Sequence, residues 1–337
     1  GLTIGGTAGM IYALRLGFRQ YERYLNRPRL VRDTSHRGLF SKRKVAGPRF
    51  NDMIVSPELS DELQRVMQSA RYAYKHGTNL PNVGLFGPPG TGKTMFIEAL
   101  ANESGMTYAK MTGGDVSALL SSGGENIAVT EIHKLFDWLE THGPAVLLVD
   151  EADAFLRSGR DGKLSEGLTA AINAFLSRTG SSSNRVMVVF ATNYPQSLDG
   201  AVQNRISSWI HVGRPALAER KKMIAHYFKE LVRHGLGKNR LPVQIGSGIT
   251  SDYLADLAHR TDGFAGRDIK MKFMDVLERE LARIAGESVQ SKYVITPELA
   301  DKVLERTLEQ ERRRLRWVAG ERPDFDGIGA ALVAAAA

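Results

Sequence analysis

Short apolar runs alternate with amphipathic segments through the middle of the chain. The runs are four to six residues long and rich in branched side chains, which is typical of strands buried on both faces. Five are expected as strands, at residues 83–86, 108–111, 145–149, 186–191 and 209–212. Helical periodicity is found between them at residues 94–104, 131–140 and 166–176. This alternation predicts an α/β fold with a parallel sheet flanked by helices.

The pattern changes after residue 212, where amphipathic helices follow one another with little strand between them. Pro215 begins a helix that runs toward His234, and apolar residues recur at helical spacing over residues 266–284. Thr296 is a good N-cap for a last helix, which has proline at its first position and is expected to end near Val318. The remaining residues are rich in glycine and alanine and are expected to form a flexible tail.

The first 45 residues follow neither pattern. Residues 1–14 carry no charge, but they are fewer than the roughly 20 apolar residues that span a bilayer. Their small residues suit packing between membrane helices. We therefore interpret residues 1–18 either as a truncated transmembrane stub or as a flexible glycine-rich terminus. Because the chain begins at a glycine, we expect it to be a fragment or a processed product.

Positive charge is concentrated just after this stub. The net charge is +8, and eleven basic residues against two acidic ones lie between Arg15 and Arg49. In residues 19–45 we expect a basic juxtamembrane arm that contacts anionic lipid. Nucleic-acid binding is a second explanation, which we do not favour because the arm follows an apolar segment.

The cysteine and histidine content limits the metal chemistry. The chain has no cysteine, which excludes disulfides and cysteine-ligated zinc or iron–sulfur sites. Its eight histidines are scattered, with no pair at metal-ligand spacing, so we expect no transition-metal site.

A glycine-rich segment directly after the first expected strand fits the pattern G-x-x-x-x-G-K-[ST]. It consists of Gly87, Pro88, Pro89, Gly90, Thr91, Gly92, Lys93 and Thr94. Glycines let the backbone curl so that its N–H groups point at phosphate, and the following helix adds its positive N-terminal dipole. Lys93 is expected to reach the β- and γ-phosphates of ATP, and Thr94 to ligate Mg²⁺. Met95 completes the predicted nucleotide-binding set.

Two further apolar strands end in polar side chains. Residues 145–149 run into Asp150, placed to hold Mg²⁺ through water, and Glu151, placed to polarise the attacking water. Asn193 follows the next strand and is expected to hydrogen-bond the attacking water or the γ-phosphate. Residues 150–153 also spell the signature of DEAD-box helicases. We discount a helicase because the phosphate loop differs and no Ser-Ala-Thr motif follows.

The order of these motifs resembles the AAA family of ATPases over about residues 48–285. The resemblance implies a P-loop AAA+ module with a five-stranded parallel sheet flanked by helices, followed by a helical lid. It implies that Ile54 and Val55 contact the adenine base. It also implies that Arg205 is an arginine finger reaching the γ-phosphate of a neighbouring subunit, and that Arg267 is the lid arginine called sensor 2.

Several segments are similar, more narrowly, to the ATPase family AAA-domain-containing protein 3 group. They are residues 28–35, 111–116, 133–138, 149–157 and 173–180. Members of that group are mitochondrial inner-membrane proteins with a matrix-facing ATPase domain, so the resemblance implies this location and favours the membrane stub. At the pore-loop position the chain has Leu119 and Leu120, where many AAA unfoldases have an aromatic residue. Polypeptide threading is therefore in doubt.

The predicted organisation has five segments: a truncated transmembrane stub (1–18), a basic arm (19–45), a large α/β ATPase domain (46–212), a helical lid (213–318) and a flexible tail (319–337). We expect Mg²⁺-dependent ATP hydrolysis by a homo-oligomer, a hexamer by resemblance. It would remodel protein or membrane-associated assemblies at the mitochondrial inner membrane, and the sequence does not identify its protein substrate. The alternative is a nucleotide-gated membrane scaffold that organises nucleoid or lipid contact sites.

Overall fold

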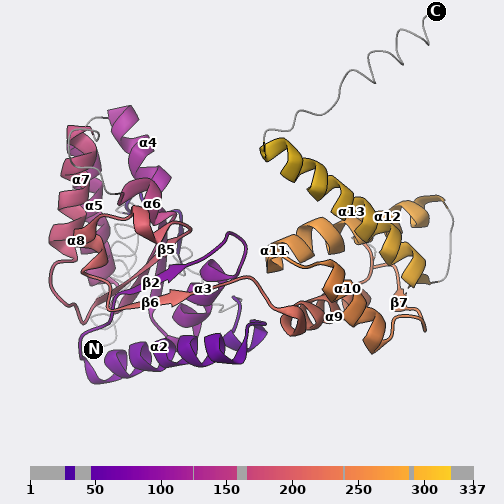
Figure 1. Ribbon diagram of the computed structural model, residues 1–337. Helices are drawn as coiled ribbons and strands as arrows, with labels where there is room; N and C mark the ends of the chain where they lie inside the picture. The colour runs from indigo at the N-terminus through magenta and orange to yellow at the C-terminus, as the bar shows by residue number, and fades with distance from the viewer. Residues whose placement is uncertain are drawn as a thin grey trace, which may run out of the picture. The chain divides into compact units, whose positions relative to one another are not determined.

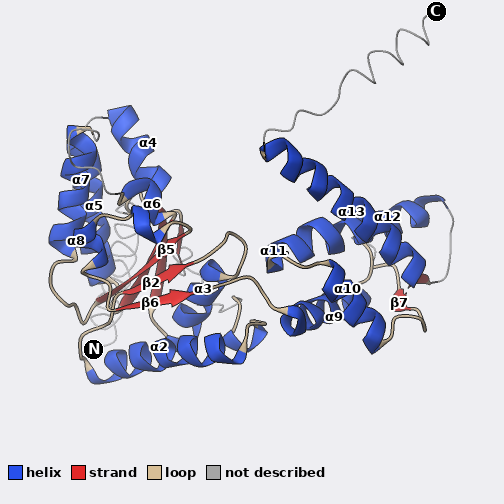
Figure 2. Ribbon diagram, viewed as in Figure 1, coloured by secondary structure: helices blue, strands red, loops and turns tan. Residues whose placement is uncertain are grey.

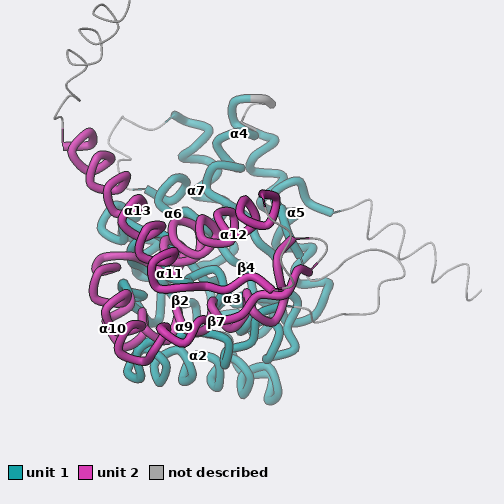
Figure 3. Tube along the Cα trace, turned by 90° about the vertical axis from the view of Figure 1, so that its right-hand side faces the viewer, with its two compact units in different colours: residues 1–214 teal, residues 215–337 magenta. Residues whose placement is uncertain are grey.

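The computed structural model describes residues 27–34, 47–123, 125–157, 165–237, 240–287 and 292–319. The chain divides into two compact units, residues 1–214 and 215–337, which are coloured teal and magenta in Figure 3. The predicted stub at residues 1–18 lies outside the described residues, as do residues 19–26 and 35–45 of the predicted arm and all of the predicted tail after residue 319. In the described part of the chain, no helix is both long and apolar enough to cross a bilayer.

The first unit is built on a six-stranded sheet with the order β1-β3-β4-β5-β2-β6. Strands β5, β2 and β6 of this sheet are labelled in Figures 1 and 2. Its strands are β1 (Asp33–Thr34), β2 (Val83–Phe86), β3 (Thr107–Thr112), β4 (Ala145–Asp150), β5 (Val186–Thr192) and β6 (Ser208–His211). All neighbouring strands run parallel except β1, which pairs antiparallel with β3. The predicted α/β fold with a parallel sheet is therefore confirmed, with one more strand than expected.

Helices cover both faces of this sheet and create two apolar cores. On one face lie α2 (Pro57–His76) and α3 (Lys93–Ser104), packed on residues such as Val146 and Leu148. On the other lie α5 (Glu125–Thr141) and α7 (Glu166–Arg178), packed on the alternate residues, such as Leu147 and Val149. Alternation along each strand sends successive side chains to opposite faces, which is why every residue of β4 except the last is buried.

Short elements link these layers at the ends of the strands. They are η1 (Phe50–Asp52), α4 (Gly113–Gly123), α6 (Ala152–Phe155), η2 (Pro195–Ser197) and α8 (Gly200–Gln203). Helix α4 follows β3 directly, and α6 follows β4 after Glu151 alone. The predicted site residues at the ends of these strands are therefore held between regular elements.

Residues 27–34, which the sequence analysis assigned to the basic arm, are part of the first unit. Leu30 and Val31 are 0% and 5% exposed and belong to the core that α5 and α7 cover. The backbone N–H of Arg32 donates to the carbonyl of Lys110 at 2.9 Å, and β1 continues this pairing along β3. Residues 27–34 thus pack on the first unit and end in its edge strand β1, which differs from their interpretation as part of a lipid-contacting arm.

The second unit is mainly helical. It contains α9 (Leu217–His234), α10 (Ser251–Arg260), α11 (Gly266–Asp268), a π-helical segment η3 (Ile269–Met274), α12 (Asp275–Glu287) and α13 (Pro297–Val318). As predicted, Thr296 caps α13, and its hydroxyl accepts the N–H of Leu299. Two features were not predicted: the π-helical turn inside the segment 266–284, and a parallel pair of β7 (Val243–Ile245) with β8 (Tyr293–Ile295).

Candidate nucleotide-binding site

The glycine-rich loop joins the carboxyl end of β2 to the amino end of α3. Gly87, Gly90 and Gly92 have φ values of 145°, 79° and 104°, where a side chain is strained. At Gly87 the constraint is also steric, because a Cβ atom there would lie 2.2 Å from the carbonyl oxygen of Val212. These glycines give the loop the curled backbone that phosphate binding requires, and α3 presents its positive end to it.

Lys93 is 8% exposed and is held inside the curl of the loop. Its ammonium group donates to the carbonyl oxygens of Gly87 at 2.7 Å and Pro88 at 2.8 Å. It also donates to Oδ1 of Asn193 at 3.0 Å. The structure thus brings together two side chains that are 100 positions apart, Lys93, predicted to reach the β- and γ-phosphates, and Asn193, predicted to bond the attacking water or the γ-phosphate.

Asp150 lies beside Thr94, as expected for two groups that share one metal ion. The Thr94 hydroxyl donates to Asp150 Oδ2 at 3.4 Å, and the Glu151 backbone N–H donates to Asp150 Oδ1 at 3.0 Å. A carboxylate and a hydroxyl are hard oxygen donors of the kind that Mg²⁺ prefers, so the residues fit this ion. Asp150 also forms an ion pair that the sequence analysis did not anticipate, with Lys110 Nζ at 2.8 Å from Oδ2.

Glu151 occupies a strained position between β4 and α6. Its φ and ψ are 49° and 46°, a left-handed conformation that is uncommon for any residue except glycine. The side chain is exposed, so its carboxylate is free to meet a water molecule. Behind it, Gly113 packs so closely that a Cβ atom there would lie 2.4 Å from the Glu151 carbonyl oxygen. The start of α4 therefore supports the Glu151 backbone.

Asn193 is positioned by a link between the ends of β4 and β5. The Thr192 hydroxyl donates to Asp153 Oδ1 at 2.5 Å and accepts the Tyr194 N–H at 3.0 Å. These bonds fix the backbone on both sides of Asn193. Asp153 and Thr192 were not predicted as site residues, although both lie within two positions of residues that were.

Residues 50–55 approach the same loop from the side. Ile54 and Val55 are half-buried, and the methyl group of Met53 lies 3.8 Å from where a Cβ atom on Gly92 would be. The Phe50 N–H is anchored on the Glu103 carboxylate at 2.7 Å, which ties the segment to α3. The contact of Ile54 and Val55 with the adenine base stays a prediction.

Arg205 lies at the opposite end of the strands from the phosphate loop. Its backbone carbonyl accepts the side-chain amide of Asn82, the residue before β2, whereas the loop follows the last residue of β2. Four residues of strand separate the two positions, which corresponds to about 13 Å. The half-buried guanidinium donates to the carbonyl of Ala201 at 2.6 Å, and its buried Nε has no hydrogen-bond partner among the described residues.

Three other predicted residues belong to other elements of the chain. Arg267 is exposed on α11 of the second unit, and its role as a lid arginine stays a prediction. Leu119 and Leu120, proposed for the pore loop, lie on α4 and are half-buried against the core under α5 and α7. The exposed side chains next to them on α4 are small: Ser117, Ala118 and Ser121.

Burial raises the pKa of Glu98, a residue on α3 close to this site. The nearby carboxylate of Asp33 raises the pKa further, and the ammonium group of Lys110 lowers it. Glu98, Asp33 and Asp150 thus form an acidic environment around Lys110, although only Asp150 is bonded to it in the structure.

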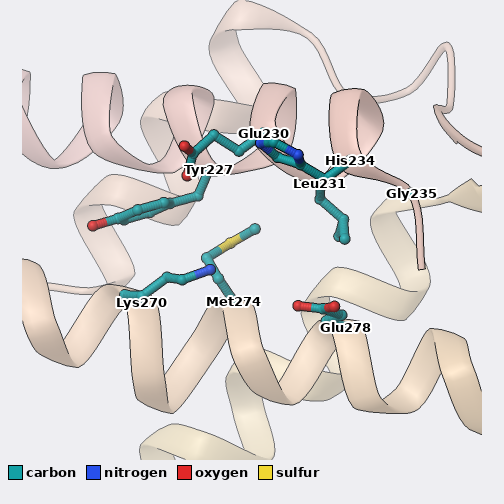
Figure 4. Close-up of a pocket in the computed structure, with 8 residues that line it drawn as sticks. All are labelled: Tyr227, Glu230, Leu231, His234, Gly235, Lys270, Met274 and Glu278. Carbon is teal, nitrogen blue, oxygen red and sulfur yellow. The ribbon is translucent and has the colours of Figure 1, made fainter. Parts of the chain in front are cut away.

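A small pocket in the second unit is not suited to a nucleotide. It lies between α9 and the π-helical segment, has a volume of about 90 Å³, and is lined by Tyr227 and Met274 among others (Figure 4). Ligand sites usually enclose about 300–1,000 Å³. The Lys270 ammonium lies 5.4 Å from the centre of the Tyr227 ring, which closes one side of the pocket with a cation–π contact.

Comparison with known proteins agrees with the geometry of the loop and strands. Residues 83–214 match the model of the family described as "ATPase family associated with various cellular activities (AAA)". The chain is 35% identical over 315 residues to ATPase family AAA domain-containing protein 3 of Xenopus tropicalis, which covers 90% of this chain and 51% of the relative. It is 34% identical to the human protein 3A, covering 90% of this chain and 52% of that protein, and 32% identical to the human protein 3B.

The chain therefore spans about half the length of these relatives. The predicted resemblance, to the AAA family in general and to the protein 3 group in particular, is confirmed by these matches. The phosphate loop, Asp150, Glu151, Asn193 and Arg205 all lie within the matched residues. Residues 83–214 of the chain thus match the AAA family of ATPases, and the chain is similar over nine-tenths of its length to ATPase family AAA domain-containing protein 3.

Proposed function

We propose that this chain hydrolyses ATP to ADP and phosphate at the carboxyl ends of β2, β4 and β5. The observation that carries the proposal is the convergence there of Lys93 with Asn193, at 3.0 Å, and of Thr94 with Asp150, at 3.4 Å. These are a cation for phosphate, an amide for water or phosphate, and hard oxygens for Mg²⁺. They come from α3 and from the ends of β4 and β5, so proximity in sequence does not account for their convergence.

Each side chain has a defined task in this reaction. The loop N–H groups and Lys93 bind the β- and γ-phosphates, and Thr94 and Asp150 would hold Mg²⁺. When bound, that ion neutralises charge on the phosphate oxygens. Glu151 accepts a proton as the oxygen of a water molecule attacks the γ-phosphorus and the bond to the β-phosphate oxygen breaks. Asn193, held between Thr192 and Tyr194, orients that water.

We also propose that hydrolysis takes place in an oligomer. Because Arg205 and the phosphate loop lie at opposite ends of β2, Arg205 does not serve the site of its own subunit. A guanidinium at the γ-phosphate stabilises transition-state charge, so we assign Arg205 to the site of a neighbour. This role requires the bond from Arg205 to the Ala201 carbonyl to open on assembly. A ring of six subunits follows from the resemblance alone.

We further propose that hydrolysis remodels protein or membrane-associated assemblies at the mitochondrial inner membrane. This location rests on the similarity to the protein 3 group, and the substrate is a proposal for the whole protein. The second candidate is a nucleotide-gated membrane scaffold. It is favoured by one observation, that the described part of α4 exposes Ser117, Ala118 and Ser121, while Leu119 and Leu120 pack on the core. Such a surface offers little grip on a threaded polypeptide.

The experiment that tests the assembled site mixes two inactive variants. Arg205→Ala retains Glu151 but supplies no arginine to its neighbour, and Glu151→Gln supplies the arginine but lacks the base. If Arg205 acts across an interface, phosphate release should be low for each variant alone and should recover in the mixture. Only in the mixture can a subunit that retains Glu151 lie next to a subunit that supplies Arg205. No recovery at protein concentrations where both variants are assembled would contradict a role in trans.

A further inference from the structure

Lys110 on β3 forms an ion pair with the carboxylate that would hold Mg²⁺. Its Nζ lies 2.8 Å from Asp150 Oδ2, the same oxygen that receives the Thr94 hydroxyl. The side chains of Lys110 and Asp150 are only 24% and 22% exposed, so solvent and salt screen the pair incompletely. The sequence motifs give no role to this lysine.

The position of Lys110 follows from the sheet. Thr112 of β3 is the register partner of Asp150, and Lys110 lies two residues earlier on the same face. Helix α3 covers that face, and the positive charge of Lys110 lowers the pKa of Glu98 on this helix. The lysine stem therefore runs along the sheet toward the metal-binding end of β4. Its ammonium contacts Oδ2, the Asp150 oxygen that also receives the Thr94 hydroxyl, and so competes with Mg²⁺ for this carboxylate.

A second carboxylate lies on the other side of Lys110. Asp33 of β1 is its direct register partner in the antiparallel pair, and side chains in such positions share one face about 5 Å apart. Strand β1 is held firmly, because Arg32 pairs with Asp115 at 2.5 Å and its N–H bonds to the Lys110 carbonyl. Lys110 thus stands between Asp150 and Asp33 with a stem long enough to turn toward either.

We propose that Lys110 is a positioning residue which holds Asp150 by its charge and turns toward Asp33 when Mg²⁺ binds, so that edge strand β1 sets the magnesium requirement of nucleotide binding. The inference rests on the proposed function, because it takes Asp150 as a Mg²⁺ residue. Lys110 and Mg²⁺ compete for the Asp150 carboxylate, and the charge of Asp33 determines how strongly Lys110 competes. Residues 27–34 thereby act on the nucleotide site without touching nucleotide.

The competition predicts opposite changes in Mg²⁺ affinity when Lys110 and when Asp33 is replaced. Lys110→Met keeps the length of the stem and removes the competing charge, so Mg²⁺ should bind more readily. Asp33→Asn removes the alternative partner of Lys110, so the lysine should stay on Asp150 and Mg²⁺ should bind less readily. Lys110→Arg keeps the charge and is the matched control. A purely structural role of Lys110 and Asp33 gives no such pair of opposite signs.

The test is a Mg²⁺ titration of the full 337-residue chain, followed by the fluorescence of a labelled ATP analogue rather than by turnover. We expect the half-saturating Mg²⁺ concentration to fall about tenfold in Lys110→Met, to rise in Asp33→Asn, and to match the wild type in Lys110→Arg. Binding of the analogue at saturating Mg²⁺ should be equal in all four proteins, which shows that the site is folded.

Three results would overturn the inference. An unchanged or higher Mg²⁺ requirement in Lys110→Met would contradict the competition between Lys110 and Mg²⁺. A lower Mg²⁺ requirement in Asp33→Asn, as expected for Lys110→Met, would contradict the role of β1. Weaker binding at saturating Mg²⁺ for Lys110→Met would show that the lysine only supports the fold. Failure of the wild-type chain to bind the analogue at any Mg²⁺ concentration is a different outcome, because it contradicts the proposed function itself.

Discussion

Gly113→Ala tests whether the backbone behind Glu151 must stay where the structure places it. A Cβ atom at residue 113 would lie 2.4 Å from the Glu151 carbonyl oxygen and 2.9 Å from the Phe155 nitrogen. Both neighbours are backbone atoms, so no side-chain rotation relieves the overlap. The φ of Gly113 lies outside the left-handed region, and the added methyl group therefore acts by contact alone.

The size of the effect follows from the displacement required. Restoring ordinary contact moves the Glu151 backbone by about 1 Å, and a misplacement of that size in an active site costs about 100-fold in rate, or about 2.7 kcal/mol in activation free energy. Lys93 and Thr94 do not touch Gly113, so the dissociation constant of ATP should stay within about threefold of the wild-type value.

The matched control is Gly114→Ala, one residue further along α4. There the Cβ atom would meet only the Thr112 hydroxyl, at an ordinary 3.8 Å. This variant should keep full activity and gain up to about 1 kcal/mol of stability, because alanine favours the helix. The assay is steady-state phosphate release with ATP affinity measured separately. Equal turnover in the two variants would refute the supporting role of Gly113.

Three further predictions concern the same unit. Asn193→Ala removes an acceptor of Lys93 and should lower kcat about 100-fold with little change in ATP affinity; an effect on affinity alone would contradict it. Folding raises the pKa of Glu98, so the folded chain binds a proton on this carboxyl group more tightly than the unfolded chain does. The contribution of Glu98 to the free energy of unfolding therefore falls as the pH rises from the unfolded pKa through the folded pKa. Thermal unfolding should therefore show Glu98→Gln to be more stable than wild type at about pH 7, with the gain lost below about pH 4. Leu30→Ala should lower the free energy of unfolding by about 2–5 kcal/mol in urea titrations, whereas Arg29→Ala, whose side chain is exposed, should not; equal midpoints would place residues 27–34 outside the core.

The sequence predicted those features that depend on local pattern. The central strands β4 and β5 are almost wholly apolar runs, the glycine-rich loop and Asn193 each follow a strand directly, and Asp150 is the last residue of β4. Because parallel strands bring their carboxyl ends to one edge, the order of the motifs was enough to place their side chains together. The N-cap of α13 was equally local, since Thr296 and Pro297 act within one helical turn.

The features that were missed depend on tertiary contacts. Strand β1 has two residues and no periodicity, and its identity comes from pairing with β3 more than 70 positions away. Asp33 and Lys110 are just as far apart in the sequence, so their proximity could not be predicted from it. Leu119 and Leu120 were expected at a pore surface, but their burial depends on how α4 packs against the core under α5 and α7. The π-helical turn at residues 269–274 carries no signal that distinguishes it from an ordinary helix.

The measurement that tests the account most directly is phosphate release by the full chain, compared with Glu151→Gln, across a range of protein concentration. We predict that wild-type turnover per subunit rises with concentration as neighbours supply Arg205. We also predict that Glu151→Gln binds ATP with unchanged affinity but hydrolyses it at least about 100-fold more slowly. Turnover by Glu151→Gln at the wild-type rate would contradict the assignment of the catalytic base, and wild-type turnover that is independent of concentration would contradict a shared site.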